Sequence, residues 1–129
     1  GQIGTAATDP TANQLIPFNE FWVSQGITYN STTRRFTVPV GGFYRITLNP
    51  FKKTGGTVFR VFIGVNNDAP VQTTHYGHTY TSDEGYDTGS LNSVVELSAN
   101  DYIVFKLYQG TIYNLPSDKF NQFSIELIG

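Results

Sequence analysis

Apolar and polar residues alternate along short stretches of the chain, and this period of two predicts β-strands. Helix formers are scarce after residue 12, and turn residues separate the stretches. The expected strands are 18–24, 27–29, 35–40, 43–49, 57–65, 90–97, 102–108 and 120–128. Short strands at this spacing predict an all-β fold, an antiparallel sandwich or jelly roll. We expect 90–97 and 102–108 to form a hairpin across 98–101, and 69–89 to be a long loop with at most short strands.

The alternation also predicts which faces of the strands are buried. The core-facing sets are Tyr44, Ile46 and Leu48, then Ile103, Phe105 and Leu107, then Phe123, Ile125 and Leu127. The opposite faces carry Tyr and Phe but few charges, which is typical of protein–protein contact. Scattered surface apolar residues are the ordinary alternative. We favour assembly, because 15% aromatic residues exceed what one small core needs.

Residues 1–16 are small and polar and show no period, so we predict an extended N-terminal arm before a single domain at 17–129. Two triplets, 1–3 and 4–6, fit the end of a collagen-like stalk, and a flexible terminus is the simpler alternative. Gln2, Ile3, Leu15 and Ile16 are the arm residues expected to face a capsid or a stalk. The first residue is Gly, so either a start Met was trimmed or the chain is a fragment, and both remain open.

Composition limits the possible functions. The 129 residues are 39% hydrophobic, enough for one domain with a core. Charged residues make up 14% and the net charge is -2, which argues against a nucleic-acid surface. No apolar run is long enough to predict a membrane-spanning helix, and residues 1–17 do not form a signal-peptide pattern. The absence of Cys excludes disulfides and Cys-based zinc sites.

Two stretches resemble the complement C1q-like domain family. The first contains Phe18-Asn19, Gly26, Tyr29-Asn30, Thr33-Arg34-Arg35-Phe36-Thr37-Val38-Pro39 and Gly42-Phe43-Tyr44-Arg45-Ile46, and the second is 94–104 with 120–125. The resemblance implies a tumour-necrosis-factor-like jelly roll of two five-stranded sheets, assembled as a compact homotrimer without enzyme activity. Arg34 and Asn100 stand where the family has turn glycines, Gln122 replaces the glycine of the last strand, and 50–90 matches little.

No motif predicts catalysis, a cofactor or a metal. The strongest metal candidates are His75 and His78, with Asp83, Glu84 and Asp87 nearby. Zinc needs three or four ligands in fixed geometry, usually on rigid elements, whereas the two His lie in a polar loop, and the carboxylates lack the spacing of a calcium loop. The chain has no nucleophile elbow, no phosphate-binding loop and no pair of carboxylates placed to face each other. We therefore predict no enzyme, no cofactor and no metal.

Two features of the turns and loops remain. Tyr76, Tyr80 and Tyr86 form a candidate contact loop, since Tyr with Gly, Ser and Thr is the composition of adaptable binding loops. It either stacks on a glycan or packs on a neighbouring subunit. Asn30-Ser31-Thr32 is a glycosylation sequon, although its turn favours Asn for its own geometry.

These observations predict a non-enzymatic homotrimer on a particle surface. A tailed-phage capsid decoration (cement) protein, located on the virion and bound to a capsid protein, is the first choice. The alternative is a receptor- or glycan-binding tip of a tail fibre or collagen-like stalk, located outside the cell or on its surface. Neither nucleic acid nor membrane insertion is expected.

The trimer interface is expected on the second face of the inner-sheet strands. Its members are Phe120, Gln122, Tyr102, Tyr108, Arg45, Lys106 and Glu126. The family topology is expected to place 43–49 beside both 102–108 and 120–128. Arg45 and Glu126 would then pair, within a protomer or across the interface.

Overall fold

The computed structural model of the chain describes residues 2–3, 14–16, 18–20, 26–49, 51–52, 59–71, 73–81, 87–109 and 122–129. The strands are β1 Gln2–Ile3, β2 Gln14–Leu15, β3 Phe18–Glu20, β4 Thr28–Asn30, β5 Arg35–Thr37, β6 Gly42–Asn49, β7 Phe51–Lys52, β8 Phe59–Val65, β9 His78–Thr81, β10 Asp87–Thr88, β11 Leu91–Leu97, β12 Tyr102–Gln109 and β13 Gln122–Leu127. No helix occurs among the described residues, and none that could span a membrane was found there.

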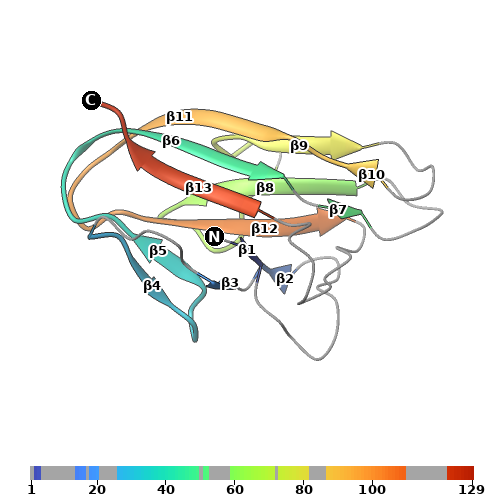
Figure 1. Cartoon of the computed structure of the whole chain (residues 1–129), viewed down its shortest axis with the longest axis horizontal. Coiled ribbons are helices and arrows are strands. Elements are labelled where there is room, and N and C mark those ends of the chain that lie inside the picture. The colour runs from blue at the N-terminus through green and yellow to red at the C-terminus, as the bar shows by residue number, and fades with distance from the viewer. Residues whose placement is uncertain are drawn as a thin grey trace.

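The strands form two antiparallel sheets that enclose one core (Figure 1). The first, the β6 sheet, has the order β11-β6-β13-β1-β3. The second, the β12 sheet, has the order β4-β5-β12-β8-β9, with β2 also paired to β12. β7 and β10 form a separate pair. The predicted antiparallel sandwich is confirmed, and β2 adds a strand to the five expected in the second sheet.

The predicted core faces are confirmed in β6 and β12. The six predicted residues are all at most 1% exposed: Tyr44, Ile46, Leu48, Ile103, Phe105 and Leu107. In β13, Phe123 and Ile125 are partly buried against this core. Leu127 was predicted to be buried and is 46% exposed, because it is the last residue of β13 and lies at the margin of the core.

An aromatic cluster around Phe18 joins the two sheets. The ring centroid of Phe18, in β3, lies 4.4 Å from that of Phe123, in β13, and both strands belong to the β6 sheet. It also lies 5.2 Å from Phe36 and 5.5 Å from Phe105, in the β12 sheet. The Tyr29 ring packs on the Phe36 ring, with 4.6 Å between their centroids. Tilted and edge-on pairs of this kind are favourable beyond their buried area, so the cluster stabilises the packing of one sheet on the other.

The predicted free arm needs a correction at its described residues. Gln2 and Ile3 form β1, which pairs with both β13 and β3. Leu15 pairs with Lys106 of β12, and Ile16 is fully buried in the core. Strand pairing uses backbone groups that every residue other than Pro carries, so a polar segment without a period can still join a sheet. Leu15 and Ile16 therefore belong to the sandwich, and Ile16 cannot face a capsid; residues 4–13 lie outside the described residues.

The predicted hairpin across 98–101 is wrong. β11 pairs with β6, whereas β12 pairs with β5, β8 and β2, so this turn crosses from one sheet to the other. The turn is held by Val38, whose N–H donates to the Asp101 carbonyl at 3.0 Å and whose carbonyl accepts from the Asn100 N–H at 2.9 Å. Asn100 has a φ of 72°, which Asn tolerates better than most residues do. A short loop between two alternating strands can connect neighbours in one sheet or carry the chain from one sheet to the other. Only the pairing partners of each strand distinguish these two connections.

We expect Phe18→Ala to lower the free energy of unfolding by about 3–5 kcal/mol, because it leaves a cavity between the sheets. Denaturant unfolding at one fixed protein concentration measures the change. Val71→Ala, at a loop position that is 40% exposed, is the control and should change stability by less than about 0.5 kcal/mol. Equal effects of the two substitutions would contradict a central role for the cluster.

Candidate functional site

The side of the β6 sheet that faces away from the core is the first candidate surface. Alternation along β6, β11 and β13 directs every second side chain outward. This outer face consists of Phe43, Arg45, Thr47, Asn49, Asn92, Val94, Glu96, Gln122, Ser124, Glu126 and Ile128. One end carries large apolar side chains together with Glu96, the register partner of Phe43, and the other end is polar but uncharged.

Three large apolar side chains define the apolar end. Phe43 is 47% exposed, Val94 is 53% exposed and Ile128 is 42% exposed. Phe43 and Ile128 lie side by side, since the Ile128 N–H donates to the Phe43 carbonyl at 2.8 Å. Val94 faces Arg45 in the register. Apolar side chains gathered on an exposed sheet face indicate a surface that a partner covers.

The charges near the centre of this face are paired within the chain. Arg45 and Glu126 are register partners, and their side chains form an ion pair at 3.0 Å, which confirms the predicted pairing within a protomer. The two side chains are 46% and 51% exposed, so the pair contributes little to the stability of an isolated chain. Beside it, the hydroxyls of Thr47 and Ser124 share a hydrogen bond.

The structure places the predicted interface residues on two different sheets. Arg45, Glu126 and Gln122 share the outer face of the β6 sheet, and Phe120 lies outside the described residues. The other predicted members, Tyr102, Lys106 and Tyr108, lie on β12 in the opposite sheet. They face away from the core, because they alternate with its buried residues. The expectation that β6 and β12 are neighbours is therefore wrong, for the same reason as the hairpin.

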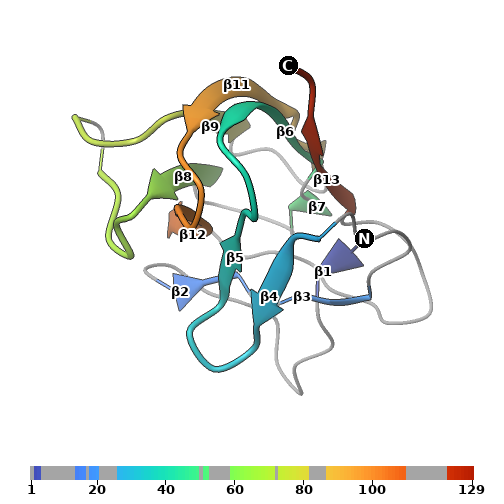
Figure 2. The ribbon, with the colours of Figure 1, turned by 90° about the vertical axis from the view of Figure 1, so that its left-hand side faces the viewer.

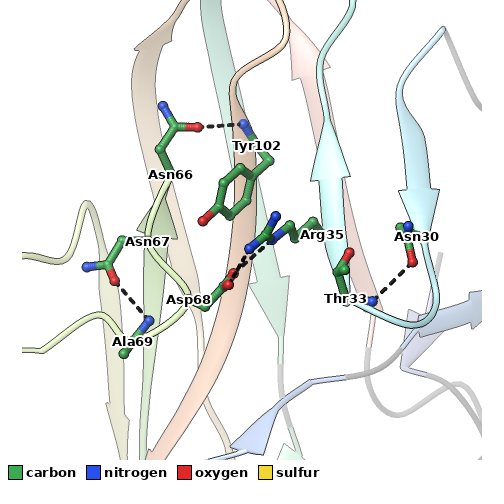
Figure 3. A network of polar contacts seen from close by, with 8 residues as sticks. All are labelled: Asn30, Thr33, Arg35, Asn66, Asn67, Asp68, Ala69 and Tyr102. Atoms are coloured by element: carbon green, nitrogen blue, oxygen red, sulfur yellow. Dashed lines mark hydrogen bonds and ion pairs between the residues drawn. The ribbon is translucent and has the colours of Figure 1, made fainter.

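A network of polar contacts forms the second candidate site, at the end of the β12 sheet (Figure 3). The guanidinium of Arg35 lies over the Tyr102 ring, 4.1 Å from its centroid, and pairs with both carboxylate oxygens of Asp68. The hydrogen bonds from Arg35 lower the pKa of Asp68, and those to Asp68 raise the pKa of Arg35. The planar guanidinium suits this bidentate and stacked arrangement.

The Asp101 carboxylate holds the neighbouring turns together. It accepts from the Ser98 N–H at 2.8 Å and from Asn66 Nδ2 at 3.0 Å. Asn66 Oδ1 in turn accepts from the Tyr102 N–H at 3.0 Å. The bonds from Asn66 and Ser98 lower the pKa of Asp101, because they favour its charged form. These polar groups satisfy one another, so the network fixes the turns at 66–68 and 98–101.

The loop 66–77 covers part of the β12 sheet. Phe62 and Val104 are at most 2% exposed, although both alternate with core residues and so face outward. Gly64 lies directly beneath the loop: a Cβ there would lie 2.2 Å from the Asn67 carbonyl oxygen and 3.1 Å from Pro70. A side chain at this position would push the loop off the sheet.

Tyr76 is displayed by this loop. The loop is held by the His75 ring, stacked on Phe62 at 4.9 Å, and by Ser93 Oγ, which donates to the Tyr76 carbonyl at 2.7 Å. The Tyr76 side chain is 52% exposed. Of the other two predicted contact residues, Tyr80 lies in β9 and Tyr86 lies outside the described residues. The described part of the chain contains no group of three or more side chains able to hold a metal.

Sequence reasoning missed several of these residues. Val94 was not recognised as an exposed residue of the outer face, although the Val94-Val95 pair signalled that one of the two faces outward. Arg35 and Asp68 are 33 residues apart, and no local pattern connects them.

Two packed antiparallel sheets with crossing connections define a jelly-roll domain of the C1q and tumour-necrosis-factor type. The family model described as the C1q domain matches residues 2–125, so the chain belongs to the C1q domain family and the resemblance is confirmed. C1q domains typically self-associate as trimers, are generally not enzymes, and typically occur outside cells or on surfaces. No curated protein matches the chain closely enough to count as a relative.

Acid is expected to weaken the fold through Asp68 and Asp101. Their pKa values in the folded chain lie below the ordinary 3.8, so their stabilising contribution is complete above that pH and is lost as the pH falls through the folded pKa. Thermal melting between about pH 5 and pH 2 should show this fall, and Asp101→Asn should reduce its size. The control is Glu96→Gln, at an exposed carboxylate outside the network. If Asp101→Asn melts with the pH dependence of the unmodified chain, the network is not the cause.

The Arg45–Glu126 pair is expected to show coupling in a double-mutant cycle. Arg45→Leu and Glu126→Leu should each lower the melting temperature of the assembled protein more than the double substitution does, because each single change leaves one charge without its partner. The value of such a pair lies in fixing which surfaces meet, since a shifted arrangement separates the charges. Effects that add within about 0.5 kcal/mol would mean that the two residues act independently.

Proposed function

We propose that this chain is a non-enzymatic structural or binding module that assembles as a homotrimer through the outer face of the β6 sheet. The observation that carries the proposal is the exposure of Phe43, Val94 and Ile128 on one sheet face. Burying these side chains against another copy removes apolar surface from water. Trimeric self-association is typical of C1q domains.

The charge arrangement supports a partner of the same kind. Arg45 and Glu126 neutralise each other before association, so covering them leaves no charge without a partner. Glu96 is the other charge on this face, and the rest is uncharged, with the polar residues Thr47, Ser124 and Gln122. By contrast, loop 66–77 already covers part of the β12 sheet, which leaves the β6 sheet as the more open of the two.

Two finer roles for the trimer stay predictions. Attachment to a phage capsid rested on a free N-terminal arm, and the burial of Ile16 removes part of that support. Binding of purified trimers to capsids that lack a decoration protein would test this role. The alternative, a receptor- or glycan-binding tip, is favoured by one observation: the exposed Tyr76 stands on a loop held in place before any ligand arrives. Such preorganisation reduces the entropy cost of binding.

Val94→Asp is expected to convert trimers into folded monomers, because association would bury a charge without a partner, at a cost of several kcal/mol. Light scattering at micromolar protein concentration measures the mass, and circular dichroism checks that the monomer is folded. Val71→Asp places the same charge on loop 66–77, away from the β6 sheet, and should leave the trimer intact. A stable monomer of the unmodified chain would overturn the proposal.

A further inference from the structure

The turn that joins β4 to β5 forms an exposed tip of the molecule. It follows Asn30, the last residue of β4, and ends where β5 begins at Arg35. Asn30, Ser31 and Thr32 are all exposed. The turn lies at the lower left of Figure 1, away from β6, β11 and β13.

The Asn30 side chain is held in a defined orientation. Its Oδ1 accepts from the Thr32 N–H at 2.9 Å and from the Thr33 N–H at 3.0 Å, the second of which is drawn in Figure 3. The Asn30 carbonyl accepts from the Arg34 N–H at 2.7 Å, and Arg34 has a φ of 60°. With Oδ1 turned toward the backbone, Nδ2 is left on the opposite side of the amide, and it makes no hydrogen bond to the residues that the structure describes.

The geometry of the turn accounts for the presence of Asn at position 30, but it does not account for the hydroxyl of Thr32. Thr32 contributes only its N–H to the turn, and its hydroxyl has no hydrogen-bond partner in the described part of the chain. Asn, a residue other than Pro, and Ser or Thr is the acceptor triplet for N-linked glycosylation. Asn30-Ser31-Thr32 is the one such triplet in the 129 residues.

We propose that Asn30 is an acceptor site for N-linked glycosylation. The donor is an oligosaccharide carried on a polyprenyl diphosphate. Nδ2 bonds to the anomeric carbon of the first sugar while the bond from that carbon to the diphosphate oxygen breaks. The diphosphate leaves with the electron pair, and Nδ2 loses one proton to a base on the transferring enzyme. Oδ1 remains a carbonyl oxygen, so the product keeps both hydrogen bonds of the turn.

A glycan at this position is compatible with assembly through the β6 sheet. β4 is an edge strand of the β12 sheet, so the attached sugar extends from the opposite sheet. The modification therefore stands independently of the proposed trimer.

The test uses the full chain, secreted from a eukaryotic cell line behind a cleavable signal peptide. Intact mass spectrometry should show an added glycan that peptide-N-glycosidase removes, converting Asn30 to Asp. Thr32→Ser should keep the added mass, and Thr32→Ala and Asn30→Gln should both lose it. Thr32→Ala should melt close to the unmodified chain, because the turn uses only the Thr32 N–H.

Secreted, folded protein without added mass would overturn the proposal. So would a glycan that persists in Asn30→Gln, since it would then be attached elsewhere. A glycan that persists in Thr32→Ala would equally contradict the role assigned to the hydroxyl.

Discussion

The contact of Phe18 with aromatic rings of both sheets is the interaction on which the rest of the structure depends. Phe18 lies on the short strand β3, whose few backbone bonds could not hold it in place alone. Its ring packs on Phe36 and Phe105 across the core, and its N–H donates to the Tyr29 hydroxyl at 3.0 Å. With β3 anchored, β1 can lie between β3 and β13 and complete the β6 sheet, whose outer face is the proposed interface.

The two faces of the sandwich differ because loop 66–77 covers part of only one of them. The turn at 98–101 carries the chain from β11 to β12, and Asp101 ties that turn to Asn66 at the start of loop 66–77. The loop then covers part of the β12 sheet (Figure 2). The β6 sheet has no such cover among the described residues, so its apolar side chains stay accessible to a second copy. One face of the sandwich is therefore partly closed and the other is open.

Both faces carry an exposed ion pair, and the two pairs have different consequences. Arg35 and Asp68 connect β5 to loop 66–77, so their pair holds elements of a single chain together. Arg45 and Glu126 connect neighbouring strands that the backbone already pairs. Their pair adds little to one chain, and its effect lies in leaving no net charge at the centre of the outer face for association.

The sequence by itself determined the longer strands and most of the core, because strand alternation is a local property. It correctly placed Ile46 and Phe105 inside. Only the tertiary structure decided which sheet each strand joins, that Ile16 belongs to the core, and that Val104 is covered on its outer side. Strand partners are selected by backbone hydrogen bonds and by packing between residues far apart in the chain, and neither leaves a local pattern.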